Sequence, residues 1–250
     1  VLALLGAPLL AAATMRWSAA TRPIYGACLA ICTVVFVMAL TQLVNAGNTV
    51  SSLHLPLGLP WVGAHFRIDA LAAFFLAVVS LGGASTSLFA IGYGEHEKAP
   101  GRVLPFYAAF LAGMILVVLA DDAFTFLVSW EFMSLSSWAL VMAHHHDPEN
   151  RRAGFVYIVM ASFGTLNLLL AFGLLASGTG GYAFAEMRGA PSAFSGLVLI
   201  LVILGAGSKA GLVPLHVWLP LAHPAAPSHV SALMSGVMTK VAVYGFIRIV

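Results

Sequence analysis

The segment FLVSWEFMSLSSWALV, residues 126–141, is apolar apart from its serines and one glutamate, Glu131. Its length approaches the roughly 20 residues that cross a bilayer as a helix. A charge at the centre of such a helix costs roughly 2.5–3.5 kcal/mol on insertion scales, so it needs a partner or a function. The serines can bond water or neighbouring helices. The segment therefore predicts a membrane helix that faces other helices, with Glu131 as a candidate functional residue.

The rest of the chain has the same character, because 61% of its 250 residues are hydrophobic and only 8% are charged. An ordinary soluble domain has roughly 25% charged residues. Basic residues are scattered, with no stripe that would bind nucleic acid. We predict an all-α polytopic membrane protein with about eight transmembrane helices. The predicted segments are 1–14, 24–45, 68–93, 103–120, 123–143, 154–177, 194–220 and 228–250.

Two connections differ in pattern. Around Pro56 and Pro60, apolar and polar residues alternate, which predicts an extramembrane hairpin or extended loop at about 50–67. Residues 178–192 are expected to form a plain loop. The first and last residues lie inside apolar runs, so we expect the chain to be a fragment of a longer protein. The opening run has no basic region of the kind that precedes a signal peptide's apolar core, and is expected to be a helix.

The positions of basic residues predict an orientation. Loops with many Lys and Arg residues tend to face the cytoplasm. The loops after odd-numbered helices are therefore predicted to be cytoplasmic and the N-terminus external. The loops after odd-numbered helices carry Arg16, Arg22, Lys98, Arg102, Arg151 and Arg152. The loops after even-numbered helices carry only Arg67 and Arg188.

Three charges fall at mid-depth on three predicted helices: Glu131, Lys209 and Lys240. A Glu131–Lys209 ion pair would reduce the cost of burying both. Such a pair could serve structure alone, by fixing the fifth helix against the seventh. A purely structural pair needs no third buried charge, whereas a proton relay needs a further residue that accepts the proton. Lys240 therefore favours proton translocation.

The seventh segment supports this interpretation. Pro214 has no backbone N–H, and Gly211 lies three residues before it, so the helix is expected to break between them. Discontinuous helices near the membrane midplane are frequent in transporters. The string GAGSKAG around Lys209 lacks the spacing of a phosphate-binding loop and follows no strand.

Several histidines lie near predicted membrane boundaries. His223 is the preferred candidate for passing protons between the cytoplasm and the buried lysines, since imidazole titrates near neutral pH. His216 and His229 are possible relay residues, for which packing or capping is an equal alternative. His144, His145 and His146 are adjacent and would not converge on one metal ion, so a solvated helix end is preferred. Cys28 and Cys32 are expected to be buried filler.

Three stretches carry a resemblance to a known family: LADDAFTFLVSWEFMSLSSWALV, GSKAGLVPLHVWLPLAHPAAPSHVSALMSG and TKVAVYGFIRI. They resemble the antiporter-like membrane subunits of complex I, Mrp antiporters and energy-converting hydrogenases. APSHVSALMSGVMTK is most similar to the large membrane subunit of the hydrogenase-4 and formate hydrogenlyase group. The resemblance implies two five-helix inverted repeats in the whole protein. Residues 103–250 would be the first repeat, truncated, and 1–102 the preceding helices with the hairpin.

The resemblance also implies roles for individual residues. Glu131 matches the family's helix-five glutamate, Lys209 the lysine of its broken seventh helix, and Lys240 a helix-eight lysine of some branches. Leu221 stands where many members have an acidic residue, so no further ion pair is expected there.

The expected function is redox-driven proton translocation by a non-catalytic subunit of a membrane oxidoreductase complex. We predict no catalytic residue, cofactor site or metal site in these residues. The expected partners are the lipid bilayer, other membrane subunits and a peripheral redox arm, in a bacterial or archaeal cytoplasmic membrane. One alternative is an Mrp-type cation/proton antiporter, which would exchange sodium for protons without a redox partner. The other is a membrane anchor that does not pump.

Overall fold

The structure of the protein, a computed structural model, describes residues 6, 21–45, 50–56, 63–97, 99–178, 180–188 and 194–250. Seven helical stretches among them are long and apolar enough to cross a membrane, as predicted for a polytopic all-α protein. Apart from Gly6, the first predicted segment, 1–14, lies outside the described residues. The stretches are α2 (Thr21–Val44), α3 with the 3-10 turn η2 (Ala70–His96), α4 (Pro100–Leu119), α5 (Ala123–Val141), α6 (Pro148–Ser177), Ser195–Ala225 and Ser228–Ile249.

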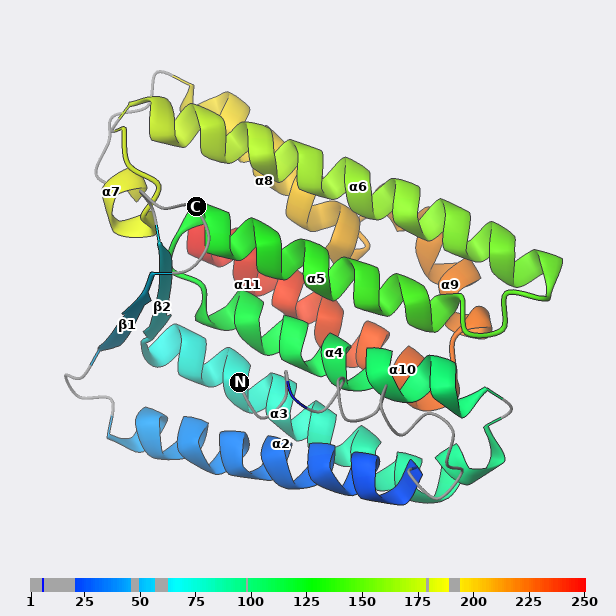
Figure 1. Ribbon diagram of the computed structural model, residues 1–250. Coiled ribbons are helices and arrows are strands. Elements are labelled where there is room, and N and C mark those ends of the chain that lie inside the picture. The colour runs from blue at the N-terminus through cyan, green and yellow to red at the C-terminus, as the bar shows by residue number, and fades with distance from the viewer. Residues whose placement is uncertain are drawn as a thin grey trace.

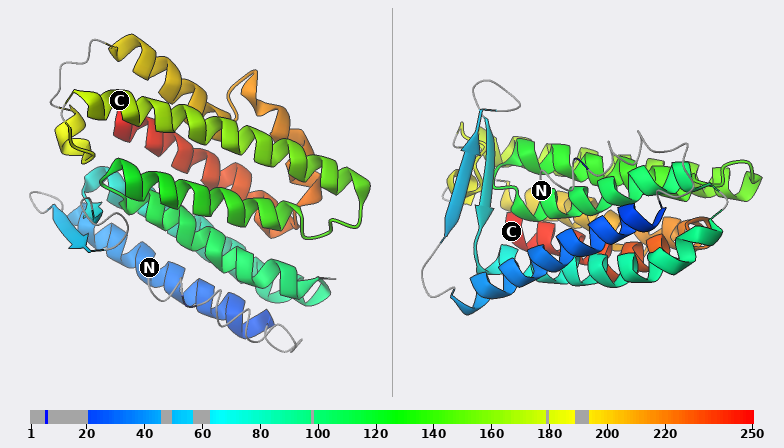
Figure 2. Two further views of the ribbon diagram at one scale, coloured as in Figure 1. Left: turned by 45° about the horizontal axis from the view of Figure 1, so that its top comes forward. Right: turned by 60° about the horizontal axis from the view of Figure 1, so that its bottom comes forward.

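The helices lie side by side in one bundle, with α2 along one edge and α6 and α8 (Ser195–Ala210) along the other (Figures 1 and 2). Helix α4 is the most enclosed of the described spans. It packs on α5, α2 packs on α3, and α6 packs on α8. At the last contact, a Cβ on Gly164 would lie 2.9 Å from the Gly205 carbonyl oxygen, so only glycine allows this close approach.

Aspartates fix where three helices begin. Asp69 accepts a hydrogen bond from the Ala72 amide before α3, and Asp122 accepts one from the Thr125 amide before α5. Asp147 does the same before α6, with Pro148 in the first turn. These are N-cap contacts, which satisfy amides that have no partner inside the helix. They explain why α6 begins six residues earlier than the predicted 154.

The predicted hairpin is present. Strands β1 (Ser51–Leu55) and β2 (Ala64–Ile68) pair antiparallel, with Ser51 opposite Ile68. They lie at one end of the bundle (Figure 1). Ion pairs tie them to the helices, because Arg67 contacts both Asp69 and Asp121. Asp121 is therefore an ion-pair residue, whereas its neighbour Asp122 caps α5.

The predicted broken seventh helix is also present. Helix α8 ends at Ala210, and Gly211 adopts a left-handed conformation with φ of 79°. The Val213–Pro214 peptide bond is cis. The chain then forms a 3-10 turn, η3 (Leu215–Trp218), and the short helix α9 (Leu219–Ala225).

Two features differ from the prediction. The expected plain loop at 178–192 contains a short helix, α7 (Phe184–Arg188), and its Ala183 bridges to Asp122. The eighth helix is interrupted: α10 (Ser228–Leu233) passes through a π-helical turn, η4 (Met234–Met238), into α11 (Thr239–Ile249). The sequence signal at this turn is the pair Ser235 and Gly236, without a proline.

Candidate functional site

Lys209 lies at the C-terminal end of α8, directly before the helix break, and is 3% exposed. Its Nζ donates a hydrogen bond of 3.1 Å to the Tyr157 hydroxyl on α6. A helix C-terminus carries partial negative charge, which favours a cation there. The break therefore places a lysine at a helix end inside the bundle, where an uninterrupted helix would have placed it mid-span.

Tyr157 is the centre of this site, although it is not among the residues that the sequence pattern predicts. Its hydroxyl lies 2.6 Å from the Ser137 hydroxyl of α5 and donates to the Met238 sulfur in the π turn at 3.6 Å. One phenol thus joins α5, α6, α8 and the π turn. The available signal was a lone polar aromatic in the apolar 154–177 segment, which is also typical of ordinary core packing.

Two side-chain hydrogen bonds lie next to the helix break. The Trp218 indole N–H donates to the Ser208 carbonyl at 2.8 Å, and the Ser208 hydroxyl donates to the Met160 carbonyl at 2.8 Å. Tyr157, Ser208, Lys209 and Trp218 line a cavity of about 10 Å³, close to the least volume that holds one water. The Ser208 carbonyl near the break thus has a side-chain donor, whereas residues 212–214 of the break are exposed.

Glu131 lies on α5 and accepts a hydrogen bond from the Thr165 hydroxyl of α6. Thr165 is eight residues beyond Tyr157, a separation of about 12 Å along the helix. Within the described part of the chain, no ion pair joins Glu131 to Lys209. The predicted direct contact was wrong, because Lys209 contacts α6 at Tyr157, whereas Glu131 contacts it at Thr165.

Lys240 begins the regular part of α11, just after the π turn, and is exposed. Its Nζ donates to the Ser235 carbonyl at 2.9 Å and to the Thr239 hydroxyl at 3.3 Å. These partners lie on its own helix. Helices α8 and α11 pack together, but no described contact joins Lys240 to Lys209.

The three candidate histidines lie in different surroundings. The Nδ1 of His223 is 2.8 Å from the Ser231 hydroxyl, and its side chain is half-buried. His216 lies in η3 with a buried Nδ1 that has no hydrogen-bond partner among the described residues. His229 is only 1% exposed, with its Nε2 2.9 Å from the Tyr25 hydroxyl. His229 is thus far more deeply placed than the preferred candidate, His223.

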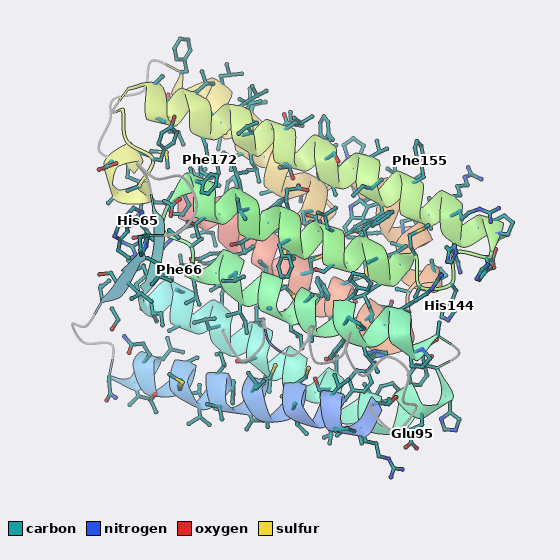
Figure 3. The ribbon with its side chains drawn as sticks, in the orientation of Figure 1. His65, Phe66, Glu95, His144, Phe155 and Phe172 are labelled. Carbon is teal, nitrogen blue, oxygen red and sulfur yellow. The ribbon has the colours of Figure 1, made fainter. Side chains whose placement is uncertain are left out.

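The adjacent histidines after α5, His144 and His145, contact different residues. His144 Nε2 lies 2.8 Å from a Glu97 carboxylate oxygen, whereas His145 contacts Arg102. Figure 3 shows His144 at the end of the bundle opposite His65 of the hairpin. Cys28 and Cys32 are free and fully buried, as expected.

Sequence comparisons relate the chain to known membrane proteins. Residues 120–250 match the family described as "NADH:quinone oxidoreductase/Mrp antiporter, TM". Hydrogenase-4 component B of Escherichia coli is 41% identical over 187 residues, which are 73% of this chain and 28% of that protein. NADH-quinone oxidoreductase subunit N 1 of Sorangium cellulosum is 31% identical over 189 residues, 71% of this chain and 37% of that protein.

Solved structures share the fold. The Mrp complex from Dietzia sp. DQ12-45-1b superposes with a TM-score of 0.81 at 25% identity, covering 99% of this chain and 47% of the matched chain. The archaeal membrane-bound sulfane sulfur reductase gives 0.75 at 22% identity, over 97% of this chain and 51% of that one. The chain spans about a third of the curated relatives it matches. This multi-pass membrane protein belongs to the NADH:quinone oxidoreductase/Mrp antiporter transmembrane family.

Proposed function

We propose that the protein moves protons across the membrane as an antiporter-like subunit of a redox-driven complex. The observation that carries the proposal is the environment of Lys209. This enclosed lysine is bonded to a neutral phenol, Tyr157, and has no carboxylate within 4 Å among the described residues. Enclosed ionisable groups in membrane bundles characteristically mark ion pathways.

The chemistry of this contact suits a group that gains and loses a proton. An ammonium donates to the Tyr157 oxygen, and a neutral amine can accept from the same hydroxyl. The site therefore retains a hydrogen bond in both protonation states. The Ser137 hydroxyl, 2.6 Å from that of Tyr157, extends the set of exchangeable groups toward α5.

The proposed proton route includes three ionisable residues, Glu131, Lys209 and Lys240. The first two contact different residues of α6: Glu131 contacts Thr165, and Lys209 contacts Tyr157. Two turns of helix separate those partners, so a proton would need water to cross the gap. Glu131 is proposed to set the proton affinity of Lys209 from this distance, and Lys240 to receive the proton. His223 is proposed to pass protons toward the buried lysines, with His216 and His229 as further relay candidates.

Domain and partner assignments follow from the family. Residues 103–250 are proposed as the first antiporter-like repeat, and 1–102 as the helices before it. The similarity to Hydrogenase-4 component B supports a hydrogenase-type complex with a peripheral redox arm and other membrane subunits. The loops after α3 and α5 are proposed to face the cytoplasm, which places the hairpin outside.

An Mrp-type antiporter is the second candidate, and the similarity to the Dietzia Mrp complex favours it. The two candidates differ in driving force. Proton movement that requires sodium or potassium and no electron donor would identify the antiporter. A third candidate, a membrane anchor that does not pump, predicts that neutral replacements of the buried charges leave transport intact and weaken assembly.

The test uses inverted vesicles that contain the full-length protein in its complex. Glu131→Gln and Lys209→Ala should abolish proton uptake driven by the electron donor, while electron transfer and subunit content are retained. Glu149→Gln and Arg152→Ala, which change exposed charges on α6, are matched controls with expected wild-type uptake. Wild-type uptake in both buried-charge variants would contradict the proposal.

A further inference from the structure

An open polar pocket of about 700 Å³ lies at the end of the bundle opposite the hairpin, between the α3–α4 connection and the α5–α6 turn. Its lining includes Glu97, His144 and Tyr93. Figure 3 shows His144 and Glu95 at this end of the bundle. It is the end that the loop charges predict to be cytoplasmic.

Glu97 is an acidic group in the wall of this pocket, with a side chain only 6% exposed. One of its oxygens lies 2.8 Å from His144 Nε2 and accepts from the Ala99 amide at 3.1 Å. His144 itself is about one-third exposed, so it contacts both water and the carboxylate. A carboxylate and an imidazole in contact can exchange a proton without any change of position.

Behind the pocket lies His229. The Tyr93 ring lines the pocket, and its centroid is 5.7 Å from that of the His229 ring. Rings of Tyr25 and Tyr107 enclose the imidazole from α2 and α4 at 5.4 Å and 5.2 Å. Nε2 lies 2.9 Å from the Tyr25 hydroxyl, whereas Nδ1 is buried without a hydrogen-bond partner among the described residues.

A buried imidazole nitrogen without a partner is costly in a purely structural role. When Nε2 donates to the Tyr25 oxygen, the lone pair of Nδ1 is free to bind a proton. If the Glu97–His144 pair releases a proton to this ring, one N–H or O–H bond breaks in the pair, one N–H bond forms at Nδ1, and the imidazole becomes a cation.

His229 is also connected to the Lys209 site through its own helix. Helix α10 continues without a gap into the π turn, and Met238 at the end of that turn accepts a hydrogen bond from Tyr157. The same phenol bonds Lys209. A change of charge at His229 would therefore act on the helix that closes the Lys209 site.

We propose that this pocket is the site of proton uptake, with Glu97 and His144 as the collecting pair and His229 as the first buried acceptor. The inference rests on the proposed proton translocation and deepens it, because it assigns an uptake site distinct from His223.

Proton uptake by inverted vesicles that contain the full-length complex tests the inference. His144→Ala and Glu97→Gln should slow uptake by roughly 10- to 100-fold. A positioned acid–base group typically accelerates a proton transfer by about 100-fold or more, so this loss is at or below the lower end of that range. Added imidazole should restore the His144→Ala rate, because the pocket has room for it and is open to water. His229→Phe should be equally slow and should not respond to imidazole, since its site is enclosed.

Matched controls are His145→Ala and Glu95→Gln, neighbours that do not line the pocket and should pump normally. Wild-type rates in Glu97→Gln and His144→Ala would overturn the inference, as would a slow His144→Ala rate that imidazole does not restore. If those variants pump normally while Lys209→Ala does not, only the uptake site is wrong. If Lys209→Ala also pumps normally, the proposed function itself is wrong.

Discussion

The Lys209 ammonium is bonded to the Tyr157 hydroxyl at 3.1 Å, and the same hydroxyl contacts Ser137. An enclosed lysine is thus held by neutral groups on two neighbouring helices. An ion pair would fix its charge, whereas these partners accept either protonation state. This arrangement connects the helix break to the proposed transport.

Tyr157→Phe removes that hydroxyl and keeps the ring that packs on Trp218. Lys209 then loses its hydrogen-bond partner in an enclosed site, which costs about 1–3 kcal/mol. Ser137 stays satisfied, because its hydroxyl still donates to the Met133 carbonyl at 2.7 Å. We expect proton uptake to fall by more than electron transfer, with a measurable loss of thermal stability. Uptake in vesicles and a melting curve of the purified complex check both effects. An unchanged uptake rate would show that the hydroxyl has no part in transport.

Thr165→Val tests the contact of Glu131. Valine has nearly the shape of threonine but cannot donate to the carboxylate. A hydrogen bond to a charged group is worth about 1.5–3 kcal/mol, and Glu131 is only half-buried, so water can replace part of it. We expect a reduced uptake rate, with a smaller effect than Glu131→Gln. Equal or greater loss in Thr165→Val would mean that packing, not the carboxylate, controls the rate.

Gly211→Ala tests the helix break. At a φ of 79° an alanine is strained, and its Cβ would collide with the Leu219 side chain. The left-handed conformation alone costs about 1–2 kcal/mol for a residue with a Cβ. The melting temperature should fall, together with uptake. Gly173→Ala on α6 is the control, because its Cβ would meet no atom within 4 Å. Equal melting temperatures for the two variants would contradict the strained break.

Asp69 at the hairpin end predicts a pH dependence. Burial raises the pKa of this carboxyl, but hydrogen bonds from Arg248 and the Ala72 amide and the charges of Arg248 and Arg67 outweigh it, so the pKa lies below its usual 3.8. A lowered folded-state pKa stabilises the fold above pH 3.8. That contribution is lost as the pH falls through the folded-state value.

Asp69→Asn isolates this contribution, because asparagine can still cap α3. The variant should melt at a lower temperature than the wild type at pH 7. The difference should shrink as the purified protein is acidified below pH 3.8. A difference that stays constant down to pH 3 would show that the carboxylate charge does not stabilise the hairpin end.

Much of the fold could be predicted because it depends on local sequence. Long apolar runs require helices in a membrane, and prolines with alternating residues at 51–69 require an extended connection. Gly211 and Pro214 end a helix through their own backbone chemistry. These features hold whatever the neighbouring helices do.

The contacts of the site could not be predicted in the same way. Whether Glu131 meets Lys209 depends on the depth and rotation of two helices that are far apart in the sequence. Lys209 lies at the level of Tyr157, two turns of α6 from Thr165, which contacts Glu131. The π turn before Lys240 was not predicted either, since MSGVM carries no helix-breaking proline.

The ratio of protons taken up to electrons transferred tests the central claim most directly. It should be measured in one vesicle preparation of the full-length complex, for Lys209→Ala beside Arg152→Ala. If Lys209 carries the proton, Lys209→Ala retains electron transfer while the translocated protons disappear, and Arg152→Ala keeps the wild-type ratio. An unchanged ratio in Lys209→Ala would contradict the account.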